Sequence, residues 1–186
     1  MTMFRLVRSD IERMRALSGT PGPASVLAVP LALLNPRLCP AVLIRLAAWL
    51  ARCRLGVLAK LVALVNLVLF GIEASPRIEI GAGLFLPHTS GTVIGAARIG
   101  RNVTIFQGVT LGAKELDMSF VPESRPRVED DVVIGAGAKI LGGVRIGTGA
   151  RIGANAVVIS DVPDGALAIG IPAKIVYADR AEQVIE

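Results

Sequence analysis

The chain has 186 residues, of which 53% are hydrophobic and 4% aromatic, and its formal net charge is +5 at pH 7. This length leaves room for one main domain and one small appendage. Few aromatic side chains are available to stack on bases, and the basic residues do not form a run that would follow a phosphate backbone. We therefore expect no nucleic-acid partner.

The charge is distributed unevenly along the chain. Residues 1–72 contain nine Lys or Arg and two Asp or Glu, a net charge of +7, whereas residues 73–186 contain eleven and thirteen, a net charge of −2. This change in composition divides the chain. We predict an apolar and basic helical region over residues 1–71, a second domain over 72–176 and a tail over 177–186.

The first region shows the spacing of helices. Phe4, Val7 and Ile11 recur on one face and predict an amphipathic helix that ends before Gly19. Two or three further short helices are expected in three apolar stretches that prolines and Gly56 separate. These stretches are residues 24–34, 41–54 and 57–70.

No acidic residue occurs between Arg13 and Ile72, although basic residues are scattered through this apolar region. An anionic membrane surface attracts such a segment. Alternatively, the helices bury their apolar faces against neighbouring subunits. A transmembrane span is disfavoured because Lys60 and Asn66 interrupt the best candidate, and a span needs about 20 apolar residues. We expect a cytoplasmic protein, with any membrane contact peripheral and on the inner face.

Aliphatic residues occupy every sixth position through a stretch of the second domain. They are Val128, Ile134, Ile140, Ile146, Ile152 and Val158. A helix repeats near 3.6 residues and an exposed strand near 2, so a period of six predicts one structural unit repeated in space. The unit is expected to be a short strand and a tight turn, with small residues at the bends. Glycine follows several aliphatic positions, where we expect corners of positive φ.

The repeats IGAGAK at 134–139 and IGANA at 152–156 resemble those of the hexapeptide-repeat acyltransferases. That resemblance implies a mainly β fold, a left-handed parallel β-helix with three hexads to each triangular coil. The motifs GIEASP at 71–76 and GLFLPHTSGTVIG at 83–95 are similar to the serine acetyltransferase branch, which has relatives that acetylate polysaccharides. The resemblance covers about residues 41–176.

His88 is the only histidine, and it lies at the position of the catalytic base in that family, while Glu73 lies at the position of its acidic partner. Acetyl transfer to a hydroxyl needs a base, and imidazole titrates near neutral pH. For His88 the alternative is a histidine that only hydrogen-bonds a turn. For the whole protein the alternatives are a scaffold protein that has lost the chemistry and a membrane-anchored binding module. A single histidine without clustered ligands does not make a zinc site, so we expect no metal.

The resemblance also implies acetyl-CoA as the acetyl donor. In relatives it lies in a groove between neighbouring β-helices of a homotrimer, and here one trimer or two associated trimers are expected. The positions that match its binding residues are Ala113, Ala136, Arg151, Ala154 and Lys174. Among these, Arg151 and Lys174 are the candidates for phosphate contacts, with ordinary solvated charge as the alternative reading.

The six-residue repeat slips by one residue between Ile94 and Ile99 and disappears between Leu111 and Val128. The interruption predicts an extruded loop over residues 113–127. In the family a loop here reaches over the active site and donates residues that bind the substrate, as loops on rigid scaffolds commonly do.

The candidate acceptor-binding residues are Pro87, Ser124 and Arg125. Relatives that bind L-serine hold its amino group with an acid just before the catalytic histidine, where this chain has Pro87. They place an Arg-His pair where this chain has Ser124 and Arg125. An unpaired ammonium forfeits a charge-assisted contact worth about 1.5–3 kcal/mol. We therefore predict a sugar hydroxyl of an exopolysaccharide or capsule unit as the acceptor, with L-serine as the alternative.

Overall fold

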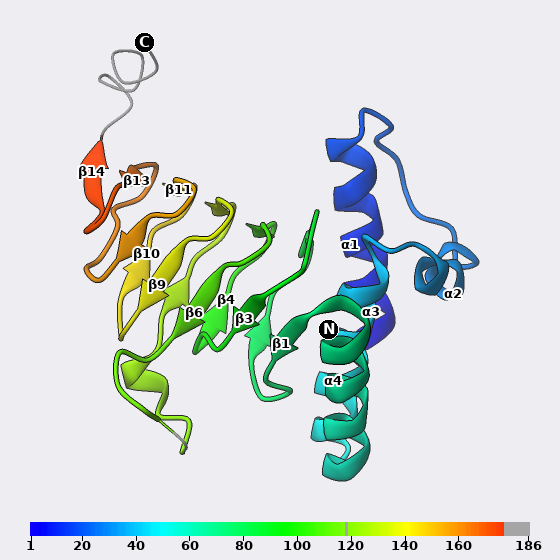
Figure 1. Ribbon diagram of the computed structural model, residues 1–186. Helices are drawn as coiled ribbons and strands as arrows, with labels where there is room; N and C mark the ends of the chain where they lie inside the picture. Colours follow the sequence, from blue (N-terminus) through cyan, green and yellow to red (C-terminus); the bar gives the residue numbers. More distant parts are fainter. Residues whose placement is uncertain (118, 177–186) are drawn as a thin grey trace.

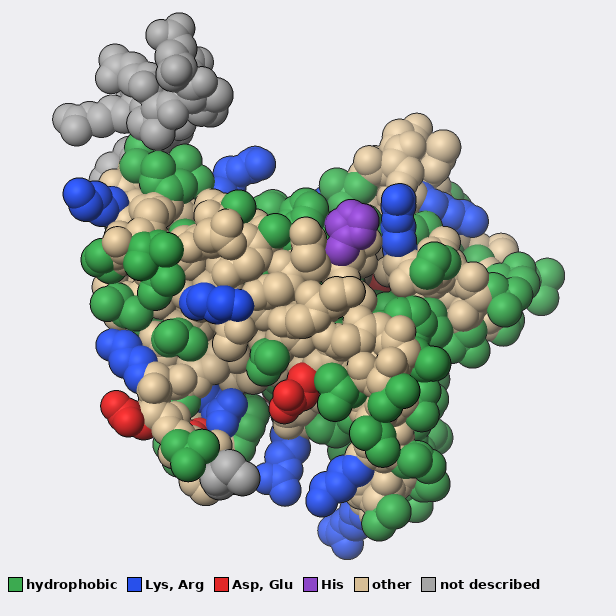
Figure 2. All heavy atoms as spheres, in the orientation of Figure 1, with side chains coloured by type: hydrophobic (Ala, Val, Ile, Leu, Met, Phe, Trp, Pro, Cys, Tyr) green, Lys and Arg blue, Asp and Glu red, His purple; other side chains and the backbone are tan. Residues whose placement is uncertain are grey.

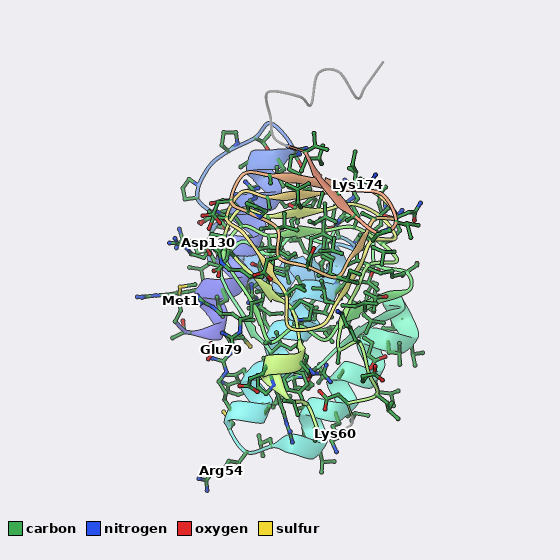
Figure 3. All side chains as sticks on the ribbon, turned by 90° about the vertical axis from the view of Figure 1, so that its left-hand side faces the viewer. Met1, Arg54, Lys60, Glu79, Asp130 and Lys174 are labelled. Atoms are coloured by element: carbon green, nitrogen blue, oxygen red, sulfur yellow. The ribbon has the colours of Figure 1, made fainter. Side chains whose placement is uncertain are left out.

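A group of helices stands at one end of a stack of short strands (Figure 1). The computed structural model describes residues 1–117 and 119–176, so the tail predicted at 177–186 lies outside the described residues. Viewed along the stack, the coils outline a triangle (Figure 3). The prediction of a left-handed parallel β-helix preceded by helices is confirmed.

The N-terminal part contains four α-helices and one short 3₁₀ segment, Ala32–Leu34. The first helix begins after Thr2, whose hydroxyl accepts a hydrogen bond from the Arg5 N–H at 3.4 Å, and it ends before Gly19 as expected. The four helices are α1 (Met3–Leu17), α2 (Ala28–Leu31), α3 (Cys39–Arg52) and α4 (Gly56–Phe70).

Short strands form three sheets, one on each side of the triangle. The first face contains β1 (Ile72–Ala74), β3 (Thr92–Ile94), β6 (Thr110–Gly112), β9 (Lys139–Leu141) and β12 (Val157–Val158). The second contains β2 (Glu79–Ile80), β4 (Arg98–Ile99), β7 (Arg127–Val128) and β10 (Arg145–Ile146). The third contains β5 (Thr104–Ile105), β8 (Val133–Ile134), β11 (Arg151–Ile152), β13 (Leu167–Ile169) and β14 (Lys174–Val176). The paired strands are parallel except β13 and β14, which are antiparallel.

The aliphatic position of each hexad faces a narrow core. Its side chains from Val128 to Val158 are at most 3% exposed. Despite the one-residue slip, Ile94 pairs with Leu111 and Ile99 with Val128, so the register is restored in the next coil. The small residues predicted at the bends also enter the core, and Ala138 is completely buried. Two side chains per hexad therefore fill the interior.

The glycines that follow the aliphatic positions have a different role from the one predicted. Gly135 does not have positive φ, but a Cβ placed there would lie 2.7 Å from the Ala154 nitrogen and 2.8 Å from the Ile152 oxygen. The next coil therefore passes too close for a side chain. Positive φ occurs two positions further on, at corners such as Gly137 (φ 73°).

A buried ion pair attaches the helices to the first coil. The Arg45 guanidinium, on α3, contacts the Asp10 carboxylate, on α1, at 3.0 and 3.1 Å, and both side chains are almost fully buried. The guanidinium also donates to the carbonyl oxygens of Ile80 and Gly81, each at 2.6 Å. Asp10 accepts a hydrogen bond from the Leu84 N–H at 2.8 Å, so every charge in this contact has partners.

Helix α4 exposes much of its apolar surface (Figure 2). Its most exposed apolar side chains include Val57, Leu61, Val68 and Leu69. No single helix within residues 1–117 or 119–176 is both long and apolar enough to cross a membrane. One pair of helical segments reaches the required length and apolar composition only when both are counted together. The pair is formed by residues 28–34 and 39–52, and it is bent by 114°.

We predict that Gly135→Ala destabilises the β-helix by about 1–3 kcal/mol, because the added methyl group forces the neighbouring backbone to move. The measurement is denaturant unfolding, followed by circular dichroism. Gly112→Ala is the matched control, since a Cβ at Gly112 meets nothing within 4 Å and that glycine has ordinary φ. Equal losses for the two variants would contradict close approach as the reason for glycine at position 135.

Candidate active site

His88 lies in the turn between Leu86, which is buried in the core, and strand β3. Two hydrogen bonds hold this turn against the end of α4. The Thr89 hydroxyl donates to the Phe70 oxygen at 2.8 Å, and the Gly91 N–H donates to the Gly71 oxygen at 2.9 Å. Gly71 caps α4 with φ 63°, a conformation that favours glycine. The GIE motif therefore ends a helix, begins β1 and supports the histidine turn.

The His88 side chain is exposed and opens onto a cavity of about 430 Å³. Figure 2 shows the histidine on the surface with a Lys or Arg side chain beside it. Pro87 and Arg37 also line this cavity, together with the end of α4, and none of the described residues that line it is acidic. Arg37 comes from the turn before α3 and was not predicted as a site residue.

Glu73 lies on the first face, on strand β1, which begins the coil that ends at the His88 turn. It pairs in register with Val93 and its side chain is exposed. No hydrogen bond or ion pair joins Glu73 to His88 among the residues that the structure describes. Its role as the acidic partner of the histidine therefore stays a prediction.

The corner that contains His88 continues as a ladder along one edge of the triangle. The Gly108 N–H donates to the Ser90 oxygen at 3.0 Å, the Gly137 N–H to Gln107 at 2.8 Å and the Asn155 N–H to Ala136 at 2.8 Å. The predicted residues Ala136 and Ala154 thus lie on the same edge as His88. This edge joins the first and third faces.

The two predicted phosphate-binding residues lie on the third face. Arg151 is on β11 and Lys174 on β14, with β13 between them, and both side chains are exposed. Strand β14, which begins with Lys174, lies at the end of the stack opposite the helices (Figure 1). Four of the five residues predicted for acetyl-CoA therefore lie on the histidine edge or on a face that borders it.

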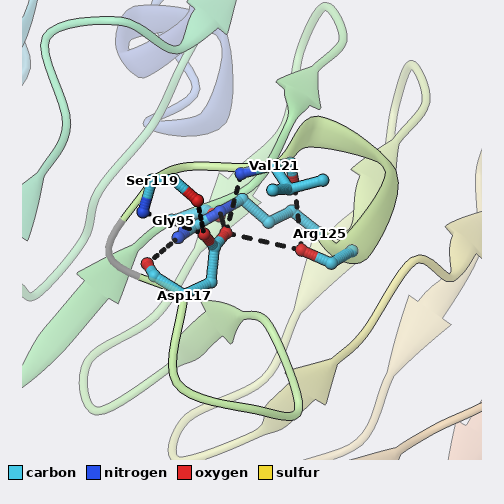
Figure 4. A network of polar contacts seen from close by, with 6 residues as sticks. Gly95, Asp117, Ser119, Val121 and Arg125 are labelled. Atoms are coloured by element: carbon cyan, nitrogen blue, oxygen red, sulfur yellow. Dashed lines mark hydrogen bonds and ion pairs between the residues drawn. The ribbon is translucent and has the colours of Figure 1, made fainter.

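The loop at 113–127 leaves the stack at a different corner, after β6 (Figure 1). Asp117 organises it by accepting hydrogen bonds from the Val121 N–H at 2.8 Å, from Ser119 and from the Arg125 Nε at 2.9 Å (Figure 4). Arg125 also donates to the Gly95 oxygen at 3.0 Å, and its guanidinium carbon lies 4.2 Å from the centre of the Phe120 ring. Arg125 therefore anchors the loop to the β-helix.

Ser124 and Ala113 line a second cavity, of about 620 Å³, under this loop. Gly142 and Gly143 of the next coil form part of its wall. Within one chain, the structure thus separates the predicted residues into two groups. His88, Ala136 and Ala154 share one edge, whereas Ala113, Ser124 and Arg125 lie together at another.

The Asp117 carboxylate stays charged well into the acidic range. Desolvation alone raises its pKa, but the hydrogen bonds from Val121, Arg125 and Ser119 favour the charged form more strongly and hold the pKa at about 2. No sequence motif marks Asp117, because its hydrogen-bond partners, Arg125 included, come from its own irregular loop.

A triangular β-helix built from six-residue repeats, with a histidine at one corner, defines the class of hexapeptide-repeat transferases. The family model described as bacterial transferase hexapeptide (six repeats) matches residues 125–160. Those residues contain all six aliphatic positions that define the period.

Curated relatives extend the similarity to most of the chain. The serine acetyltransferase of Helicobacter pylori strain J99 is 42% identical over 149 residues, which are 80% of this chain and 85% of that protein. The serine acetyltransferase of Mycobacterium tuberculosis is 43% identical over 133 residues, 71% of this chain. The matched region spans only 57% of that relative's length.

Solved structures give the same result. The serine acetyltransferase of Neisseria gonorrhoeae in complex with serine has a TM-score of 0.78 and 31% identity, over 92% of this chain and 68% of that one. A serine acetyltransferase in complex with CoA has a TM-score of 0.79 and 32% identity, over 94% and 69%. The chain belongs to the serine acetyltransferase family of hexapeptide-repeat proteins.

We predict that the loop keeps its structure from neutral pH to about pH 4 and loses it as the pH falls towards 2. The pKa of Asp117 is lowered from its ordinary value of 3.8, so its stabilising contribution is complete above that value and is lost on further acidification. Hydrogen exchange of residues 113–125 measures this. Asp117→Asn is the control and should lack both the protection and the pH step. A step in the parent near pH 3.8 would contradict the assignment.

Proposed function

We propose that this protein is an acetyl-CoA-dependent O-acetyltransferase whose acceptor is L-serine. The observation that carries the proposal is the one histidine, exposed in a cavity at the corner formed by the family's own motif. Family membership supports the same activity, since the relatives are named serine acetyltransferases. Family membership therefore favours L-serine over the sugar acceptor predicted from the sequence.

The chemistry needs few groups. The neutral imidazole of His88 takes the proton of the acceptor hydroxyl while the oxygen attacks the thioester carbonyl carbon. The C–O bond forms, the C–S bond breaks, and the proton passes from the imidazole to the departing thiolate. An exposed imidazole at a cavity wall can meet both substrates directly, so no covalent acetyl-enzyme is required. We assign Glu73 the supporting role of stabilising the imidazolium, because its strand β1 pairs with β3, the strand that follows the histidine turn.

We propose that acetyl-CoA lies along the edge that carries His88, Ala136 and Ala154. The ladder of corners gives this edge small residues in successive coils, so that an extended ligand can approach the backbone. Arg151 and Lys174, exposed on the adjoining third face, supply positive charge for its phosphates.

We further propose a homotrimer in which the loop of one chain completes the histidine cavity of its neighbour. Within one chain the loop and His88 occupy different edges of the triangle. If the loop contributes to acceptor binding, as the resemblance implies, Ser124 and Arg125 must reach a histidine in another copy. The Asp117 contact holds the loop in shape for that purpose.

The prediction of a sugar acceptor considered only the charged residues at positions that match the family's binding residues. It missed Arg37, whose guanidinium lines the cavity, because Arg37 lies far away in the sequence. A cavity with a guanidinium suits an acceptor that carries a negative group. The structural basis for preferring a neutral sugar is therefore weaker than the sequence indicated.

We expect efficient, saturable release of CoA thiol from acetyl-CoA with L-serine, and little with sugar or lipid-linked sugar acceptors. His88→Asn should lower turnover on the order of 10²- to 10⁴-fold by removing the general base, with the fold kept because this side chain is exposed. Circular dichroism checks the fold of the variant. Turnover of sugars but not of L-serine would overturn the acceptor, and an unchanged rate in His88→Asn would overturn the base.

We also propose that the exposed apolar face of α4 rests on an anionic membrane surface. Its apolar side chains are accompanied by Arg54 and Lys60, which lie at the lower end of the helical part (Figure 3). No acid occurs between Arg13 and Ile72 to oppose the attraction. Apolar insertion together with basic side chains is the combination that holds interfacial helices on membranes.

We therefore expect the protein to sediment with vesicles that contain anionic lipid and to be released as salt rises, because screening weakens the attraction. Leu61→Asp and Val68→Asp together should reduce binding, since both side chains are exposed on α4. Vesicles of neutral lipid are the control. If the protein stays in the supernatant at low salt, the face of α4 is better explained as an interface between subunits.

A further inference from the structure

We propose that Arg37 binds the carboxylate of the acceptor and makes the His88 cavity selective for hydroxy acids. This inference rests on the proposed acetyltransferase function and adds the residue that recognises the acceptor. Arg37 is a binding and specificity-determining residue and takes no part in proton transfer.

The first support is the charge of the cavity. Its wall is formed by the turn before α3, the end of α4 and the histidine turn. Among the described residues of one chain, Arg37 and His88 are the only lining residues with ionisable side chains. The cavity therefore presents the permanent positive charge of Arg37 and the imidazole of His88 to the same small volume, and an anion is the complementary ligand.

The second support is the way in which Arg37 is held. Its backbone N–H donates to the Asn35 Oδ1 at 2.9 Å, and the Leu38 and Cys39 N–H groups donate to the Asn35 oxygen at 3.0 and 2.8 Å. These bonds fix the backbone and leave the guanidinium with no ion pair or hydrogen bond among the described residues. The five donors of the guanidinium are therefore available to a ligand.

The chemistry then selects the ligand. In L-serine two carbon atoms separate the hydroxyl oxygen from the carboxylate carbon, so one small cavity can hold the hydroxyl at His88 and the carboxylate at Arg37. A guanidinium binds a carboxylate through two parallel hydrogen bonds, which also orients the hydroxyl. No acid in the cavity meets the ammonium group. Glycerate, which has a hydroxyl in its place, should therefore also be acetylated.

Steady-state kinetics tests this assignment. Arg37→Gln should raise KM for L-serine and glycerate by about tenfold, with kcat nearly unchanged, because it removes a charge-assisted contact. Arg37→Lys should restore part of the loss. The neutral analogue serinamide should show no such change. The matched control is Arg77→Gln, which removes an exposed arginine in the turn between β1 and β2, outside the cavity lining.

The same kinetics separates two sources of anionic ligand. If Arg37→Gln raises KM for acetyl-CoA and leaves KM for L-serine unchanged, Arg37 binds a phosphate of the donor and the inference is wrong. An equal rise for L-serine and serinamide would also overturn it, because the carboxylate would then not be the group recognised.

A second measurement does not depend on turnover. His88 should react faster with iodoacetate than with iodoacetamide, each rate being divided by that of N-acetylhistidine with the same reagent. In both reactions the imidazole nitrogen bonds to the CH₂ carbon, iodide leaves, and the displaced ring proton goes to buffer. Peptide mass spectrometry separates His88 from the two cysteines.

The preference for iodoacetate should disappear in Arg37→Gln and persist in Arg77→Gln. If the preference is present but L-serine is not turned over, the proposed acceptor fails while the anion site stands. If the parent shows no preference, the anion site is overturned whatever the acceptor.

Discussion

The buried contact between Asp10 and Arg45 fixes the helices against the first coil of the β-helix, and the later coils stack on that coil. Two charges are tolerated away from water because each one is fully hydrogen-bonded, the guanidinium to carbonyl oxygens of the first coil and the carboxylate to a backbone N–H of the same coil. The contact therefore sets the first coil against α1 and α3. Since α4 continues directly into β1, it also sets the relation between the helices and the histidine turn, and a cavity lined by both parts depends on it.

The β-helix was predictable because its core packing follows from a local sequence pattern. Each aliphatic position from Val128 to Val158 meets the same position one coil away, so a six-residue period contains the whole packing rule. The handedness came only from the resemblance. The predicted reason for glycine at position 135, a positive φ, was wrong. Glycine is needed there because the Ala154 backbone passes too close for a side chain, and no local sequence pattern indicates that distance. The arrangement of the helices rests on the Asp10–Arg45 pair, and composition alone does not pair those residues.

The site was predictable to a smaller extent. His88 was found because it is the one histidine and lies in a recognisable motif, and its corner does continue to Ala136 and Ala154. Arg125 was found by position, but its contact with Asp117 depends on the path of an irregular loop. Arg37 was missed because the wall opposite His88 comes from a segment far away in the sequence. Motifs locate reactive atoms, whereas the residues that face them across a cavity are set by tertiary structure.

The antiparallel strand β14 gives the β-helix a definite end. A parallel stack of identical coils offers its last strand as a template, and another copy can extend it indefinitely. Here β14 turns back and pairs with β13 in the opposite direction, and Gly170 and Ala173 pair with Val157 on the neighbouring face. The helices occupy the other end of the stack (Figure 1). The third face is thus closed to continued growth in the parallel register, which opposes polymerisation of this regular β structure into fibres.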